Sequence, residues 1–151
     1  MLRRDYEGQN CSIARALEVV GDRWTLLIVR DVSLGRHRFD ELLASLGVAS
    51  NVLADRLNRL VEDGILERAQ YSERPARFEY RLTRMGRDLA IPLRALMQWG
   101  DRYLSEKPPR VARRRSDGAA VSVGLVANDG SRVRRDDLEV VPGPGYALSS
   151  R

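Results

Sequence analysis

Apolar side chains recur at helical spacing in the segment 50–62. Leu53, Leu57, Leu60 and Val61 stand at positions i, i+4, i+7 and i+8, which places them on one face of a helix. The opposite face is polar and consists of Asn51, Asp55, Asn58, Arg59 and Glu62. The segment therefore predicts an amphipathic helix with one face buried and one face free to meet a partner.

A shorter apolar stripe precedes it in the segment 39–46, at positions i, i+3, i+4 and i+7. The turn 47–49, which contains a glycine, separates the two segments. We expect Ser50 to cap the downstream helix and Asp63-Gly64 to end it. Two short helices joined by such a turn, the second with a polar outer face, predict a helix-turn-helix.

Two strand-like runs follow this motif, over residues 65–71 and 78–82. The segment 72–77 between them has turn chemistry and places Arg74 and Arg77 at its tip. A hairpin directly after the second helix is the wing of a winged helix-turn-helix. Such a helix can enter a DNA major groove, and a basic hairpin beside it can reach phosphates or the minor groove.

Two further helices are predicted before the helix-turn-helix. Ser12 is expected to cap a helix over 13–20 that Gly21 ends. Asp22 is expected to cap a second helix over 23–30, which is apolar on nearly all sides. A helix with apolar side chains all round is typical of a buried position.

A long helix is predicted after the wing, from Arg84 to about Ser105, with Thr83 as its cap and a kink at Pro92. Its stripe comprises Leu89, Pro92, Leu93, Leu96, Met97, Gly100, Tyr103 and Leu104. This stripe is wider than one small winged helix can cover, so we expect a symmetric dimer formed through the N- and C-terminal helices. A two-fold axis would present two recognition helices to repeated half-sites.

Two consecutive prolines, Pro108-Pro109, mark a boundary in the chain. We expect a winged-helix and dimerisation domain over 1–106, and a linker with a short β-rich C-terminal extension over 107–151. In this extension we expect a hairpin with strands over 121–125 and 132–134, and a further strand over 138–141. The fold class is therefore mainly α with a small β-sheet (α+β).

The formal net charge is +5, and its placement is more informative than its total. Residues 1–106 carry 17 basic and 16 acidic side chains (+1), and residues 107–151 carry 9 and 5 (+4). The window 68–87 is locally basic, with six arginines against Glu73 and Glu79. The clustering of arginine at the wing is better evidence for nucleic-acid binding than the total charge is.

The chemistry-bearing residues are few. The chain has one cysteine and one histidine, without a phosphate-binding glycine loop or a cluster at metal-ligand spacing, so we expect no enzyme activity, cofactor or metal. A lone cysteine fits the reducing cytoplasm. The longest apolar run, 26–29, has four residues, so we expect no membrane partner.

Short motifs spread over residues 10–105 form a specific set. They include Cys11, Gly21-Asp22-Arg23-Trp24, Arg38-Phe39-Asp40-Glu41-Leu42, Leu53-Ala54-Asp55-Arg56-Leu57, Asp63-Gly64-Ile65-Leu66 and Leu82-Thr83. This set resembles HxlR-type winged helix-turn-helix transcriptional regulators, a MarR-like family. The resemblance implies a bacterial DNA-binding homodimer, usually a repressor. Ser12 replaces a proline that is common in the family, and the extension lacks the paired cysteines that suggest a zinc ribbon in some members.

Nine residues are candidates for contact with double-stranded DNA. They are Arg38, Ser50, Asn51, Asp55, Arg56, Asn58, Arg59, Arg74 and Arg77. Asparagine pairs well with adenine and arginine with guanine, and the alternative for each residue is a solvated surface. Asp55, which would repel phosphates, can instead orient an arginine. Arg56 suits a phosphate contact or an intramolecular ion pair.

Cys11 and the two tryptophans are candidates for regulation. The family resemblance implies that Cys11 can sense oxidants or electrophiles, because a thiol near a helix N-terminus is stabilised as its thiolate. The alternative is a buried small hydrophobic residue. Trp24 and Trp99 fit the core and the dimer seam, and the alternative is an effector pocket between the terminal helices.

These patterns lead to a main hypothesis and two competing ones. The main hypothesis is a homodimeric repressor that reads a pseudo-palindromic operator and is relieved by a small-molecule or thiol-reactive effector. The second is a winged-helix protein-interaction module without DNA binding, which would need no amides or arginines on its recognition face. The third, an enzyme, has little support from the residues present.

Overall fold

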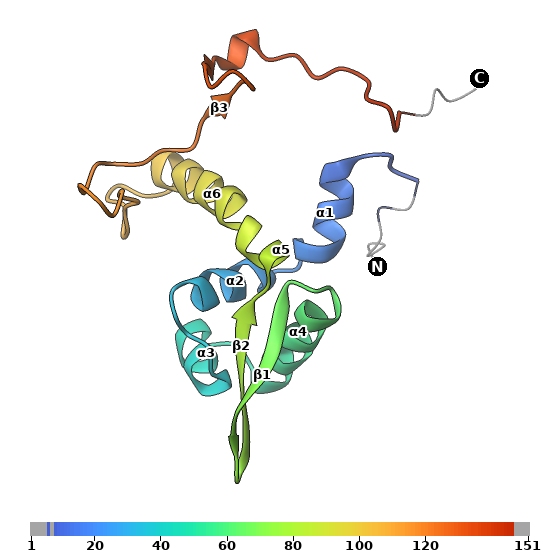
Figure 1. Ribbon diagram of the computed structural model, residues 1–151, viewed down its shortest axis with the longest axis vertical. Coiled ribbons are helices and arrows are strands. Elements are labelled where there is room, and N and C mark those ends of the chain that lie inside the picture. Colours follow the sequence, from blue (N-terminus) through green and yellow to red (C-terminus); the bar gives the residue numbers. More distant parts are fainter. Residues whose placement is uncertain (1–5, 7, 147–151) are drawn as a thin grey trace. The chain divides into compact units, whose positions relative to one another are not determined.

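The computed structural model describes residue 6 and residues 8–146 (Figure 1). The chain forms two compact units, residues 1–90 and residues 91–151. The first contains α1 (Ser12–Val20), α2 (Thr25–Ser33), α3 (Phe39–Leu46), α4 (Ser50–Glu62), β1 (Leu66–Glu73), β2 (Ala76–Leu82) and α5 (Arg84–Asp88). Helix α6 (Ala90–Tyr103) leads into the second unit, with β3 (Leu125–Val126), β4 (Arg132–Val133) and the 3₁₀ turn η1 (Arg135–Asp137). The predicted helical fold with a small wing sheet is confirmed, and the functional boundary after residue 106 stays a prediction.

The core of the first unit is built from the predicted apolar stripes. Helices α2, α3 and α4 bury their stripes together with the start of β1. The largest side chains that are almost fully buried are Ile28, Val29, Asp31, Leu42, Leu53, Leu57, Leu60 and Leu66. Because the three helices share this core, the outward face of α4 is held in a fixed direction.

The helix starts differ from the predicted caps. Ser12 and Ser50 are the first residues of α1 and α4, and the cap positions are Cys11 and Ala49. Helix α2 starts three residues after Asp22, at Thr25. The predictions placed the caps wrongly because a serine or aspartate near a helix start fits several adjacent positions equally well.

The predicted cap at Thr83 is confirmed. Its hydroxyl accepts a hydrogen bond from the Gly86 N–H at 3.1 Å and donates one to the Gly64 carbonyl at 2.6 Å. Gly86 also lies close to the backbone: a Cβ at this position would stand 2.2 Å from the Ile65 carbonyl oxygen. The start of α5 is thereby fixed against the chain between α4 and the wing.

The long helix predicted over 84–105 is broken at Leu89 into α5 and α6. Pro92 is the third residue of α6 and does not kink a helix interior. In the first turn the N–H that proline lacks would have no partner within the helix, so proline is tolerated there. The predicted kink is therefore wrong, and the interruption falls three residues earlier.

The wing is longer and its turn tighter than predicted. Strands β1 and β2 pair antiparallel from Leu66↔Leu82 to Glu73↔Ala76, with an irregularity between Gln70 and Ser72. Only residues 74–75 lie between the strands, so the predicted loop 72–77 is too long. Arg77 belongs to β2, opposite Ser72. The hydrogen-bonded pairing of β1 and β2 continues through the predicted loop, because polar residues can also pair in an exposed hairpin.

The extension forms a hairpin as predicted, but its strands are shorter, and the first lies at Leu125–Val126 and not over 121–125. Leu125 pairs with Val133 and Val126 with Arg132. The strand predicted over 138–141 is wrong: this segment follows η1 and joins no sheet of the described residues. Apolar residues with high strand propensity do not form a strand where no neighbouring strand is available for their backbone hydrogen bonds. Among the described residues, no helix has the length and apolar content needed to cross a bilayer.

Candidate DNA-binding surface

Helix α4 turns a polar face outward. Leu53, Leu57 and Leu60 on its inner face are at most 1% exposed. The outer face exposes Ser50, Asn51, Asp55, Asn58 and Arg59. Four of these five are neutral or basic hydrogen-bonding groups, which are the groups that read base edges.

Two arginines of α4 are linked to carboxylates. The Arg56 guanidinium lies 2.8 Å from an Asp22 carboxylate oxygen and is 16% exposed, so Arg56 forms the intramolecular pair. Arg59 lies 3.4 Å from Asp55 and 3.8 Å from Asp22, and is 48% exposed. Asp55 also approaches Arg56 at 3.3 Å. Asp22, which the sequence suggested as a cap, therefore connects the α1–α2 turn to the recognition helix.

This linkage lies beside a polar pocket of about 300 Å³. Its lining includes Glu18, Asp22, Arg56, Arg59 and Glu62. Sequence reasoning missed the part that Asp22 plays, because more than thirty residues separate Asp22 from Arg56. The one available signal was that Asp22 follows Gly21 in a turn, where its carboxylate is free to meet another element.

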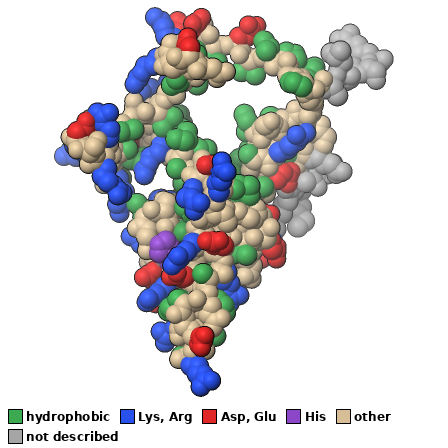
Figure 2. Space-filling model, viewed as in Figure 1, with side chains coloured by type: hydrophobic (Ala, Val, Ile, Leu, Met, Phe, Trp, Pro, Cys, Tyr) green, Lys and Arg blue, Asp and Glu red, His purple; other side chains and the backbone are tan. Residues whose placement is uncertain are grey.

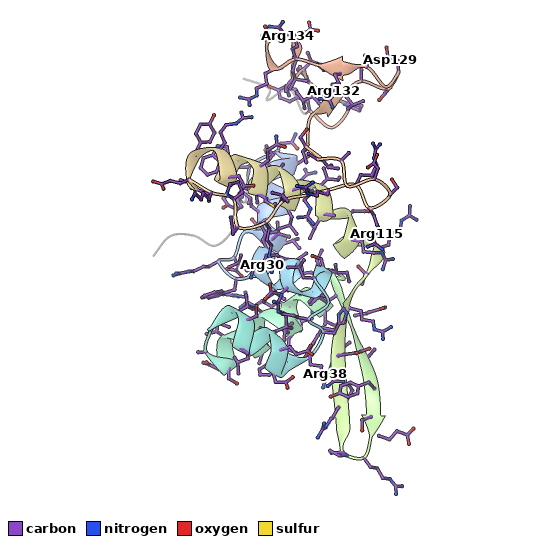
Figure 3. The ribbon with its side chains drawn as sticks, turned by 90° about the vertical axis from the view of Figure 1, so that its left-hand side faces the viewer. Arg30, Arg38, Arg115, Asp129, Arg132 and Arg134 are labelled. Carbon is purple, nitrogen blue, oxygen red and sulfur yellow. The ribbon has the colours of Figure 1, made fainter. Side chains whose placement is uncertain are left out.

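Arg38 stands where α3 meets the wing. Its guanidinium lies over the Tyr71 ring, 4.7 Å from the ring centroid, and Figure 3 shows Arg38 beside the hairpin. The Arg38 backbone forms an isolated β-bridge with Glu79, and its N–H donates to Glu41 at 3.0 Å. The pKa of Glu41 is lowered by hydrogen bonds from the backbone N–H groups of Arg38 and His37. Arg38 thus couples the first helix of the motif to the wing.

The wing carries basic side chains to its tip (Figure 2). Arg74 and Arg77 are exposed, and neither forms an ion pair with a described residue. Arg81, nearer the base, pairs with Glu79, and Arg68 lies over the Phe78 ring at 3.7 Å. The tip arginines therefore differ from the basal ones in having no internal partner for their charge.

Cys11 is partly exposed at the start of α1. The backbone N–H groups of Ala14 and Ile13 lower the pKa of its thiol below the ordinary value, and the nearby charge of Arg15 acts in the same direction. A lower pKa raises the fraction of reactive thiolate at neutral pH.

The two tryptophans belong to different compact units. Trp24 is half-buried before α2, with the Arg23 guanidinium 5.4 Å from its ring centroid. Trp99 in α6 is 56% exposed and contacts Tyr103, with 5.6 Å between ring centroids. Trp99 therefore lies on the surface of its own unit.

A buried three-helix core, an outward amide-bearing helix and a basic hairpin define a winged helix-turn-helix DNA-binding regulator. The model of the HxlR-like helix-turn-helix family matches residues 19–108. The chain belongs to this family, whose members are transcriptional regulators rather than enzymes.

Known proteins resemble the chain over most of its length. The HTH-type transcriptional regulator Rv3095 of Mycobacterium tuberculosis is 43% identical over 148 residues, which cover 96% of this chain and 92% of the relative. The crystal structure of PA1607, a putative transcription factor, is 39% identical with a TM-score of 0.80, covering 90% of this chain and 97% of that one. The reduced form of the transcriptional regulator YodB from Bacillus subtilis is 28% identical with a TM-score of 0.55, covering 66% and 99%.

Proposed function

We propose that the protein is a homodimeric repressor that binds a pseudo-palindromic operator. Helix α4 enters the major groove of each half-site, and the wing contacts the backbone or the adjacent minor groove. The observation that carries this proposal is the exposed row of Asn51, Asn58 and Arg59 opposite the buried leucines of α4. An asparagine amide can form two hydrogen bonds with adenine, and an arginine guanidinium can do the same with guanine.

Exposed apolar side chains support the dimer. On α1, Ile13 is 71% exposed; on α6, Leu96 is 53% and Trp99 56% exposed, and Leu104, directly after α6, is 73% exposed. No side chain of α6 is fully buried. Apolar surface of this kind is stabilised when a second copy covers it. Two copies related by a two-fold axis would present two α4 helices to the two half-sites.

The alternative is a winged-helix module that binds another protein and no DNA. Such a module needs no amides or guanidinium groups on α4 and no unpaired arginines on the wing. The observed outer face, with two exposed asparagines and an exposed arginine, favours DNA over this alternative.

The operator is found by footprinting the purified protein on genomic fragments, and the role of α4 is then tested in Asn51→Ala and Asn58→Ala variants. Removing a bidentate interaction with a base is expected to weaken specific binding by about 1–3 kcal/mol, with relaxed specificity at one position. Asn128→Ala, the same exchange at an exposed site in the extension, serves as the control. Unchanged footprints and affinities in both α4 variants would exclude α4 from sequence reading.

The proposal includes relief of repression by a thiol-reactive effector acting at Cys11. Because the chain has one cysteine, a disulfide would join the two subunits: diamide takes up two hydrogens and becomes a hydrazine, while the two thiols become one disulfide. Support comes from the partial exposure and lowered pKa of Cys11. We expect diamide to release operator DNA from the native protein and not from Cys11→Ser. Release from the variant as well would contradict this part of the proposal.

A further inference from the structure

The second compact unit contains a pocket of about 850 Å³ between α6 and the chain that follows it. The side-chain amide of Gln98 on α6 connects the two sides. Its Nε2 donates to the Val123 carbonyl at 3.1 Å, and its Oε1 accepts from the Val123 N–H at 2.9 Å. Gln98 thereby satisfies both backbone groups of Val123, which has no strand partner, and holds the extension along the helix.

The walls of this pocket are mainly apolar. Its apolar lining includes Ile91, Met97, Val111, Val121, Leu125 and Val133. Ile91 and Val111 are each 64% exposed and Val121 is 52% exposed. These side chains meet at a hollow that the unit leaves open to solvent, and the hollow has the volume of a typical small-molecule site.

Three arginines also line the pocket: Arg94 on α6, Arg113 after it and Arg132 on β4, which is labelled in Figure 3. Arg113 donates to the Gly118 carbonyl, and none of the three forms an ion pair with a described residue. Among the described residues, the lining contains one carboxylate, that of Asp101. The pocket therefore combines an apolar wall with an excess of two positive charges.

We propose that this pocket binds an organic anion with an apolar ring or short aliphatic body and one carboxylate. The valine and methionine side chains would cover the apolar body. The guanidinium groups of Arg94 and Arg132 would hold the carboxylate, since arginine matches a carboxylate with two parallel hydrogen bonds. A purely apolar occupant, such as a face of a second copy, would form no ion pair with the three arginines, so it would leave their charges uncompensated.

Isothermal titration calorimetry of the full chain with 2-naphthoate tests the proposal, with the neutral 2-naphthamide as a matched probe. Naphthoate is expected to bind one site per chain with a Kd of about 0.1 mM or below. Naphthamide is expected to bind at least about tenfold more weakly, because it lacks the charge that the arginines complement.

The double variant Arg94→Gln and Arg132→Gln is expected to lose about tenfold or more in naphthoate affinity and to leave naphthamide binding unchanged. Arg134→Gln is the control, because Arg134 pairs with Asp136 and does not line the pocket. Coinciding thermal melts of the variants show that any loss is not a loss of fold.

Three results would overturn the inference: equal affinity for the acid and the amide, full affinity in the double variant, or no binding of either naphthoate or octanoate. Operator binding measured on the same samples keeps the two proposals separable, since the pocket residues lie outside the α4 face. A pocket that binds no anion leaves the operator footprint intact, and a failed footprint leaves the calorimetry intact.

Discussion

At Asp31 the protein buries a carboxylate that is 1% exposed. The Arg30 Nη2 lies 2.8 Å from its Oδ1, and the Arg36 guanidinium lies 3.7 Å away. Burial raises the pKa of Asp31, but the hydrogen bonds from the Arg30 and Ser45 side chains and the charges of Arg30 and Arg36 outweigh it, so the net pKa lies below the ordinary value. Asp31 is therefore ionised in the folded protein at neutral pH and stabilises the fold.

The pH dependence follows from the direction of this shift. A carboxyl with a lowered folded pKa contributes its full stability above its unfolded pKa, near 4, and loses it as the pH falls through the folded value. We expect Asp31→Asn to lower the free energy of unfolding by about 1.5–3 kcal/mol at pH 7. Urea unfolding at pH 7 and pH 3 measures the difference, which should shrink at pH 3 because this pH lies below the unfolded pKa, so the unfolded carboxyl is already protonated. Glu67→Gln, at an exposed site, is the control, and an equal loss at both pH values would contradict the assignment.

Single residues show where sequence reasoning succeeds and where it stops. The outward positions of Asn51 and Asn58 follow from helical spacing, because the buried leucines determine which face is left for solvent. The pairing of Asp22 with Arg56 depends on how two elements distant in sequence pack together, so no local pattern contains it. The stacking of Arg38 on Tyr71 was missed for the same reason.

The wing is the element whose function can be isolated best, because its tip carries the two unpaired arginines. We expect Arg74→Ala with Arg77→Ala to weaken operator binding and to reduce the slope of log K against log salt by up to about 2, one unit for each phosphate that is no longer neutralised. Titrations of fluorescent operator DNA at several salt concentrations give this slope.

Arg81→Ala is the matched control for the wing, because Arg81 lies on β2 like Arg77 but is paired with Glu79. It is expected to change the slope by much less. If the double variant retains both the native affinity and the native slope, the wing takes no part in binding.

The sequence predicted which segments form helices and wing strands better than it predicted where these elements begin and end. Each helix of the first unit and both wing strands were expected from apolar periodicity, since burial of one face determines which segments order. The residues at which these elements begin and end depend on weaker local interactions, such as capping hydrogen bonds, for which adjacent residues compete. Ser12 and Ser50 were offered as caps one residue too late, and the helix break at Leu89 has no proline or glycine at the break to announce it.

For the whole molecule, the exposed apolar residues of α1 and α6 predict assembly through these helices. We expect Leu96→Glu with Leu104→Glu to shift the protein from dimer to monomer in sedimentation-velocity experiments, because a charge placed in an apolar interface is costly to desolvate. Operator affinity should fall in parallel, since half-sites would then be bound one at a time.

Val140→Glu is the control for this experiment, because Val140 is 90% exposed in the extension. A native protein that sediments as a monomer at micromolar concentrations, while still protecting a full two-fold operator, would contradict the dimer. From the sequence, only the surplus of apolar side chains on the terminal helices could be predicted. The geometry of the dimer could not be predicted, because the pattern of one chain does not specify the matching surface of its partner.

If the protein binds DNA as proposed, the carboxylates around Arg59 have a consequence for how it discriminates among DNA sites. Arg59 has electrostatic partners in Asp55 and Asp22 before any duplex arrives. To contact a base, Arg59 must break its interactions with these two carboxylates. It does so only where the hydrogen bonds that it gains from the base are stronger than the interactions that it loses. A guanine edge offers two aligned acceptors, and a mismatched site offers fewer. In that role the acidic neighbours are an internal competitor for Arg59, which gives them up only at a site that offers both acceptors.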